Sequence, residues 1–162
     1  MNILLNDLIY LVGKWQGIGY AEYPTIQPVE YREELIFTIN NKDSVIHFEQ
    51  RTWILSSDKR NNEPIFWESG FLIDKGKGLF EMVSAQKSGR MEILRGSAQR
   101  IHDDKIKLPL ASVSVLNDDR MIRSGRVFTF SKNVLHYELA MSTTANPSYQ
   151  RHLASRLTKM DS

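Results

Sequence analysis

The chain has 162 residues, of which 41% are hydrophobic and 25% charged, and its 21 basic and 19 acidic residues leave a formal net charge of +2. This size and composition are typical of one soluble globular domain, which we expect to span residues 1–162. The interleaved charges argue against nucleic acid as a partner. The absence of cysteine excludes disulfides, thiolate metal sites, a cysteine nucleophile and covalent haem attachment.

The N-terminal residues predict a short helical segment. Leu4, Leu5, Leu8 and Leu11 recur at helical spacing, and Gly13 follows as a stop signal. The segment has no basic start and no long apolar run. We therefore expect no signal peptide, no membrane span and a cytoplasmic location.

Residues 13–26 read as an unusual first strand. Because side chains alternate along a strand, Trp15 shares one face with the small residues Gly17, Gly19 and Ala21. Glycine inside a strand is typical of a sharp bend or of close approach by another backbone or a ligand. The pattern therefore predicts a wall against which something flat can lie, and it ends at Pro24.

From there on, hydrophobic residues recur mostly at every second position, between clusters of turn residues. The expected strands cover residues 31–39, 45–55, 65–73, 79–85, 91–98, 106–110, 112–116, 120–130 and 134–141. Residues 151–159 fit both a helix and a strand. About ten short strands joined by tight turns predict an all-β fold, a single antiparallel up-and-down barrel, which has no open sheet edge and can enclose a ligand.

Few residues suggest catalysis. No two of the four histidines have the spacing of a local zinc site, and no phosphate-binding loop or nucleophile elbow is present. Glu33 and Glu34 point to opposite faces of their strand, so we interpret them as a half-exposed strand beside Arg32 and not as a carboxylate pair. The residues alone therefore predict a barrel that holds a small apolar ligand.

A set of motifs, in order along almost the whole chain, resembles the nitrobindin family, whose haem-binding barrels are similar in shape to fatty-acid-binding proteins. The matching segments are residues 13–19 (Gly-Lys-Trp-Gln-Gly-Ile-Gly), 23–26 (Tyr-Pro-Thr-Ile), 63–64 (Glu-Pro), 68–71 (Glu-Ser-Gly-Phe), 85–89, 141–147 (Met-Ser-Thr-Thr-Ala-Asn-Pro) and 152–153 (His-Leu). Each segment alone is a weak signal, whereas the run at residues 13–26 together with the late histidine is specific.

The resemblance implies a barrel of about ten strands that binds ferric haem b non-covalently at one mouth. It implies that the last segment is a strand, with His152 facing inward as the proximal iron ligand, and that Thr25 lies against the haem. A neutral imidazole is an ordinary ligand of haem iron. The further haem contacts expected from the resemblance are Ile65, Phe66, Arg126 and Met141. For Arg126, an ordinary arginine on a wet strand face is the alternative.

The family's iron binds nitric oxide and isomerises peroxynitrite to nitrate. The resemblance therefore favours an isomerase with these small molecules as partners and with no catalytic group beyond the haem iron. A non-catalytic barrel that carries a fatty acid or another small apolar ligand, or a nitric oxide sensor or carrier, is the alternative. A homodimer is also compatible with the resemblance.

The chain departs from the family at one position. Family members carry a histidine near the distal face of the haem, where this sequence has Phe66 after Ile65. A donor for a hydrogen bond to an iron-bound ligand is therefore missing at this position.

Overall fold

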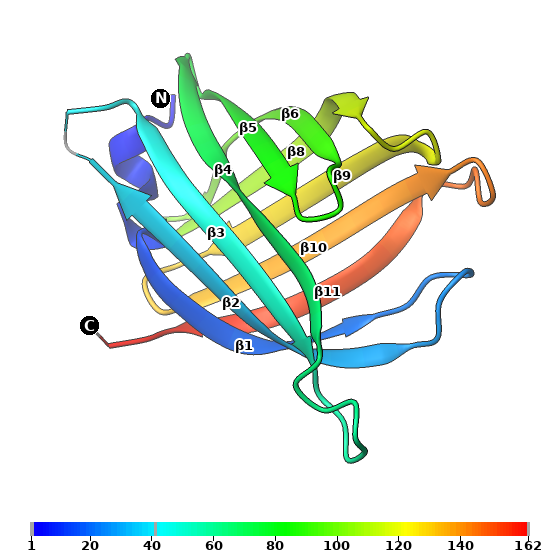
Figure 1. The fold of residues 1–162 in the computed structure, drawn as a ribbon. Coiled ribbons are helices and arrows are strands. Elements are labelled where there is room, and N and C mark those ends of the chain that lie inside the picture. The colour runs from blue at the N-terminus through cyan, green and yellow to red at the C-terminus, as the bar shows by residue number, and fades with distance from the viewer. Residues whose placement is uncertain (1, 41, 162) are drawn as a thin grey trace.

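Turn residues at short intervals fold the chain into successive hairpins, which join into one antiparallel sheet (Figure 1). A computed structural model describes residues 2–40 and 42–161. The strands are β1 (Gly13–Ala21), β2 (Val29–Ile39), β3 (Val45–Ile54), β4 (Pro64–Gly76), β5 (Leu79–Gln86), β6 (Met91–Ser97), β7 (Gln99–His102), β8 (Lys105–Leu116), β9 (Met121–Phe130), β10 (Val134–Thr143) and β11 (Gln150–Lys159). The expected up-and-down barrel is confirmed, and residues 151–159 lie in a strand.

The barrel closes in two places that hairpins alone would not join. The first strand pairs with the last, β1 with β11, and β6 pairs with the second half of β8. Ten strands thus form the ring, and the short β7 pairs with the first half of β8. Closure leaves the ring without an unpaired edge, which is a physical advantage of a barrel over an open sheet.

Strand β8 corrects one expectation. Two short strands were expected around Pro109, but the strand runs without a break from Lys105 to Leu116. Pro109 lies between the segment of β8 that pairs with β7 and the segment that pairs with β6. The neighbouring strand is interrupted there, so the missing N–H of proline leaves no ladder hydrogen bond unmade.

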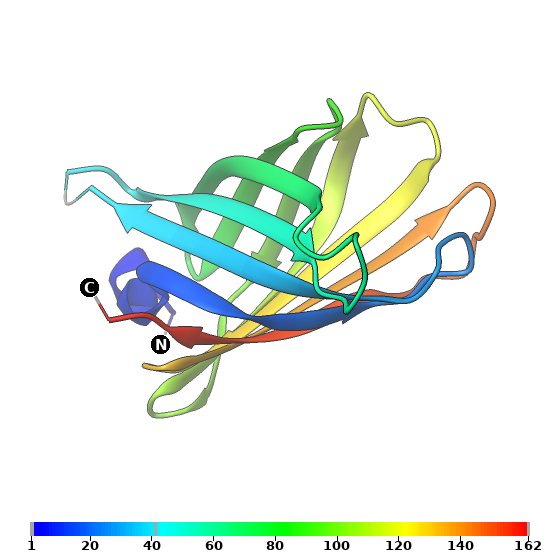
Figure 2. The ribbon, with the colours of Figure 1, turned by 60° about the horizontal axis from the view of Figure 1, so that its bottom comes forward.

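The expected N-terminal helical segment is confirmed as η1 (Leu5–Leu11), a 3-10 helix that covers one end of the barrel (Figure 2). Leu8 and Leu11 are fully buried, and the Trp15 indole N–H donates a 2.8 Å hydrogen bond to the Leu11 carbonyl. A large apolar core fills this end of the barrel. Within residues 2–40 and 42–161, no helix has the length and apolar character that crossing a membrane requires.

The glycines of β1 allow close packing inside the protein. A Cβ atom at Gly17 would lie 1.9 Å from the Arg156 carbonyl oxygen of β11, and one at Gly19 would lie 2.2 Å from the Tyr31 ring. The small residues therefore bring β11 and Tyr31 close to β1. Of the uses expected for these glycines, close approach of another backbone is the one that the packing demonstrates.

We expect Gly17→Ala to destabilise the barrel, because the added methyl group must push β1 away from the backbone of β11. Such overpacking destabilises the folded state by about 1–3 kcal/mol, which corresponds to a fall in melting temperature of about 2–12 °C for a chain of this size. Thermal unfolding followed by circular dichroism measures the change. Ile18→Ala, at the neighbouring exposed position of the same strand, is the control, and a Gly17→Ala protein as stable as this control would contradict the explanation.

Candidate functional site

The end of the barrel opposite η1 carries a cavity. The connections β1–β2 and β10–β11 lie side by side at this end (Figures 1 and 2), and the Tyr23 hydroxyl of the first donates to the Asn146 carbonyl of the second. The cavity measures about 270 Å³. Its apolar lining includes Ile26, Ile65, Phe66, Leu139, Met141 and Leu153, and His152 also lines it. Four of the six expected haem contacts, Ile65, Phe66, Met141 and His152, are therefore together in one cavity.

His152 reaches the cavity because β11 contains a bulge. Leu139 pairs with Leu153 and Ala140 pairs with Arg151, so His152 is the extra residue between them. Without the bulge, strict alternation would turn His152 away from the inward side chains of Leu153 and Ser155. A β-bulge re-aims a side chain in this way. His152 also lines a groove of about 570 Å³ outside the cavity, so it stands where groove and cavity meet.

The surroundings of His152 fix its orientation and its charge. Its Nδ1 lies 3.3 Å from the Glu22 carbonyl oxygen, and its ring meets the Tyr23 ring edge to face at 5.3 Å between centroids. Because a carbonyl can only accept, Nδ1 carries the proton and the lone pair of the neutral ring is on Nε2. Burial lowers the pKa of His152 below its ordinary value, an effect that the Glu22 carbonyl opposes and the positive charge of Arg90 reinforces. The imidazole is thus neutral at pH 7 and able to bind a metal through Nε2.

A second bulge lies across the barrel in β4. Thr52 pairs with Phe66 and Trp53 pairs with Pro64, which leaves Ile65 as the extra residue. In the ring of ten strands, β4 is the fourth neighbour of β11 in one direction and β6 is the fourth neighbour in the other. We call the part of the barrel from β4 to β6 the facing wall, because it lies opposite His152. Phe66 belongs to this wall.

The floor of the cavity is polar. Glu33 is completely buried and lines the cavity, and it accepts hydrogen bonds from Gln50 at 3.2 Å and from Ser155 at 3.0 Å. Burial raises the pKa of Glu33 to about 7, with the two hydrogen bonds opposing the shift and the charge of Glu68 adding to it. Glu33 and Glu34 point to opposite faces of a half-exposed strand, as expected, but Glu33 lies on the buried face with Tyr31 and Leu35, which the sequence interpretation did not foresee.

Two tyrosine hydroxyls lie close to this carboxyl group. Tyr31 and Tyr137 both line the cavity, and their buried hydroxyl groups have no hydrogen-bond partner among residues 2–40 and 42–161. Burial raises the pKa of both tyrosines above its ordinary value, so both are neutral donors. The floor therefore offers hydrogen-bonding groups beneath an apolar chamber.

Arg126 lies inside the barrel, and the alternative of a wet strand face is wrong. Its side chain is 1% exposed and forms ion pairs with Glu68, through both terminal nitrogens, and with Glu92, at 2.7 Å. Although burial disfavours the charge, Glu68 and Glu92 raise the pKa of Arg126 well above its ordinary value. The guanidinium is thus committed to two carboxylates, and it is not among the residues that line the cavity. A contact between Arg126 and haem or an anion stays a prediction.

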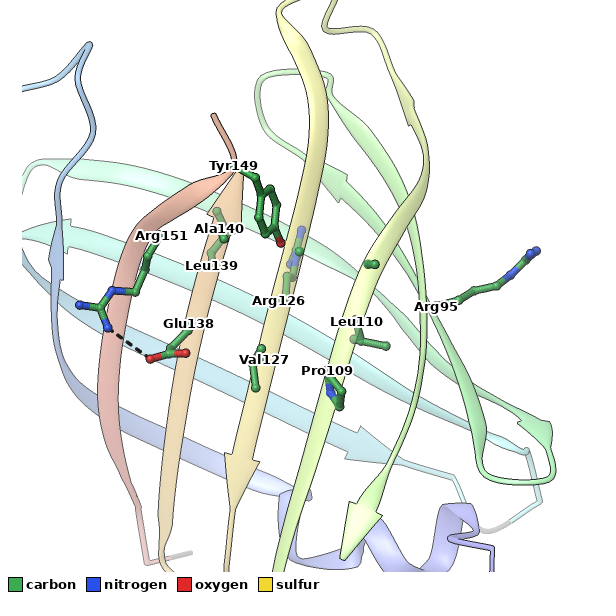
Figure 3. A pocket seen from close by; sticks show the side chains of 12 residues that line it. Arg95, Pro109, Leu110, Arg126, Val127, Glu138, Leu139, Ala140, Tyr149 and Arg151 are labelled. Carbon is green, nitrogen blue, oxygen red and sulfur yellow. Dashed lines mark hydrogen bonds and ion pairs between the residues drawn. The ribbon is translucent and has the colours of Figure 1, made fainter. Parts of the chain in front are cut away.

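Figure 3 shows the outside of the wall near Arg126. A shallow pocket of about 290 Å³ lies there, and Arg126 points away from it behind β9. Arg151 and Glu138, on the near face, pair with each other at 3.3 Å. The charged groups of this outer pocket are therefore already matched within the protein.

Thr25 is exposed in the turn that follows β1, where the Ile26 amide donates to the Tyr23 carbonyl. It is not one of the cavity-lining residues, whereas its neighbour Ile26 is. A contact between Thr25 and haem stays a prediction.

Arg90, which lines the cavity from the facing wall, was not predicted as a site residue. It follows the β5–β6 turn, and its side chain pairs with Asp118, 28 residues away, so local sequence carries no signal for its position. Glu33 was not predicted either, although an acidic residue at every-second-residue spacing from Tyr31 and Leu35 was a visible signal for a buried carboxyl. The Glu22 carbonyl could not be found in this way, because a backbone group carries no residue signature.

Comparisons with known proteins identify the family of the chain and support its fold. The family described as THAP4-like, heme-binding beta-barrel domain matches residues 4–159. A protein from Arabidopsis thaliana named peroxynitrite isomerase Rv2717c is 37% identical, over 94% of this chain and 87% of its own. A peroxynitrite isomerase from a Nocardioides strain is 29% identical, over 95% and 92%. The crystal structure of Rv2717c from M. tuberculosis superposes with a TM-score of 0.87 at 29% identity and covers 97% of both chains.

The buried carboxyl group predicts an unusual dependence of stability on pH. The pKa of Glu33 is raised in the folded protein, so ionisation of this carboxyl group lowers the free energy of unfolding. The loss is absent below the unfolded-state pKa of 4.5, grows as the pH rises and is complete above about 7. Glu33→Gln removes this titration, and its stability relative to the wild-type protein should increase by about 3 kcal/mol between these pH values. Urea unfolding at a series of pH values measures the difference.

Glu34→Gln is the matched control, because Glu34 is the next residue, points outward and pairs with Gln16 and Lys14. Because the Glu34 side chain is 19% exposed, this control removes a carboxyl group without the complete burial that affects Glu33. If both variants follow the same pH profile, or if Glu33→Gln loses stability as the pH rises, the assigned pKa is wrong.

Proposed function

Since the chain belongs to the THAP4-like, heme-binding β-barrel family, we propose that it binds ferric haem b non-covalently at the mouth of the barrel, that Nε2 of His152 is the proximal iron ligand, and that the loaded protein isomerises peroxynitrite to nitrate. The activity is proposed from relatives that carry the name peroxynitrite isomerase. Nitric oxide is proposed as a second small ligand of the same site.

The orientation of His152 carries the proposal. Imidazole ligands of metals usually donate their other N–H to a carbonyl or carboxylate, which fixes both the tautomer and the plane of the ring. The Nδ1–Glu22 hydrogen bond supplies this arrangement before any ligand arrives. The edge of the Tyr23 ring restricts rotation further, and the lowered pKa keeps Nε2 free of a competing proton.

The rest of the lining fits a flat, largely apolar group with polar edges. Leu153 and Met141 lie on the same side as His152, and Phe66 lies on the facing wall. These side chains can shield a porphyrin from water, while the groove outside the cavity leaves a path to solvent. No cysteine is available for a thioether bond, so the binding is non-covalent.

Bound haem would supply a Lewis-acidic iron, which is the chemistry that peroxynitrite isomerisation needs. The chain's own contribution is to orient the imidazole, to exclude water from one side of the haem and to keep the cavity open to small anions. Phe66 can add packing but no hydrogen bond to a ligand on the iron.

We expect the purified apoprotein to bind hemin with a saturable Soret shift, and His152→Ala to lose this shift because His152 is the one histidine among the described residues that line the cavity. Absorption titration at neutral pH measures both. His136→Ala is the control, since His136 is exposed on β10, and its titration should match the wild type. A His152→Ala protein whose hemin spectrum and affinity are those of the wild type would contradict the proposed ligand.

We expect the hemin-loaded protein to accelerate the decay of peroxynitrite and to yield nitrate. Stopped-flow absorption gives the rate, and product analysis gives the ratio of nitrate to nitrite. Free hemin at the same concentration is the reference. Decay no faster than with free hemin would contradict an isomerase and favour a carrier or sensor.

A further inference from the structure

The wall that faces His152 lacks a polar group at Phe66 but has one at Arg90. Phe66 in β4 and Arg90, directly before β6, line the same cavity as His152. Arg90 is the only lysine or arginine among the cavity-lining residues that the structure describes.

Arg90 is held in place from behind. Its Nη1 lies 3.4 Å from a carboxylate oxygen of Asp118, with side-chain exposures of 18% and 8%. Arg120 also contacts Asp118, through Nε at 3.0 Å and Nη2 at 3.1 Å. These hydrogen bonds from Arg120, opposed by partial burial and aided by the charge of Arg90, lower the pKa of Asp118. Asp118 is therefore an ionised anchor for the Arg90 guanidinium.

The anchor does not use all of the donors of Arg90. The buried Nε–H has no hydrogen-bond partner within residues 2–40 and 42–161. In the described part of the chain the guanidinium pairs with Asp118 through Nη1, and the Arg90 side chain is 18% exposed, so its other terminal nitrogen can donate to an anion in the cavity. The planar guanidinium is well suited to a carboxylate or an oxyanion, because it can donate two parallel hydrogen bonds.

The other cations near the site do not compete for this role. The terminal nitrogens of Arg126 pair with Glu68 and Glu92 beneath the cavity, and Arg151 pairs with Glu138 on the outside of the barrel. An anion that enters the mouth therefore meets one cation that is both fixed in position and incompletely hydrogen-bonded.

We infer that Arg90, fixed by Asp118, binds an anionic group at the mouth of the barrel, on the side that faces His152. The anion is a carboxylate of the haem or a small anion on the iron, and in this form the inference rests on the proposed function. Arg90 then supplies from the β5–β6 turn the polar contact that Phe66 cannot supply from β4. It is a binding residue for the anion, and Asp118 positions it.

The test compares Arg90→Leu and Arg90→Lys with the wild type, and uses Arg120→Leu as the control. Like Arg90→Leu, the control removes one positive charge that pairs with Asp118. Arg120, however, is 81% exposed and does not line the cavity. Circular dichroism and thermal unfolding establish that each variant is folded. Arg90→Lys keeps the charge, so it remains informative if leucine prevents folding.

Two arms with haem distinguish the sources of the anion. In the first, azide is titrated into the ferric hemin-loaded proteins, with neutral imidazole as the comparison ligand, and the Soret band is followed. In the second, the apoproteins are titrated with hemin and with its uncharged dimethyl ester. We expect Arg90→Leu to weaken either azide or hemin binding at least tenfold, with imidazole and the ester changed less than twofold and Arg90→Lys intermediate. The arm that responds identifies the anion.

A third arm without haem separates this inference from the proposed function. The apoproteins are titrated with the anionic dye 1-anilinonaphthalene-8-sulfonate and with the neutral dye N-phenyl-1-naphthylamine. Selective loss of the anionic dye in Arg90→Leu supports the anion site even if the wild-type protein binds no hemin, a result that would contradict only the proposed function. Affinities unchanged by Arg90→Leu in all three arms, or reduced equally by Arg120→Leu, would overturn the inference.

Discussion

The pairing of β1 with β11 is the constraint on which the site depends. These strands come from opposite ends of the chain, and their backbones approach closely because Gly17 has no side chain to hold Arg156 away. The same pairing continues to the mouth, where the Glu22 amide donates to the His152 carbonyl at 2.8 Å and the Glu22 carbonyl accepts from Nδ1 of the same residue. Closure of the barrel and orientation of the imidazole are thus two results of one set of backbone contacts.

Along its axis the barrel has three layers with different chemistry. The end under η1 is apolar and closely packed. Above it lies a polar layer in which Arg126 joins Glu68 and Glu92, and in which Gln50 and Ser155 hold Glu33. Buried charges of this kind add little net stability compared with an apolar core, because each must be removed from water. Their position suggests a different consequence, which is that the polar layer limits how deeply an apolar ligand can enter and confines it to the mouth.

Much of the fold follows from the sequence, because alternation of hydrophobic residues is a local signal. Strand positions, the helical segment before Gly13 and the barrel could be predicted from this signal. The neighbourhood of Ile65, Phe66, Met141 and His152 was implied by the family resemblance and not by alternation. Alternation could not predict the bulges at His152 and Ile65, because a bulge depends on which residues pair across two strands. The contact between Arg90 and Asp118 depends on the closure of β6 against β8, which local patterns do not encode. The burial of Glu33 was within reach of the sequence, since the residue lies on the same face as Tyr31 and Leu35.

The central claim is that the chain presents a neutral, preoriented imidazole to the iron of a haem at the mouth of the barrel. A crystal structure of the hemin-loaded protein at neutral pH tests it most directly. The account predicts a bond between the iron and Nε2 of His152, with Nδ1 still on the Glu22 carbonyl and the porphyrin between β11 and the facing wall. Iron bound by another residue, or by His152 through Nδ1 after the ring has turned away from Glu22, would contradict it.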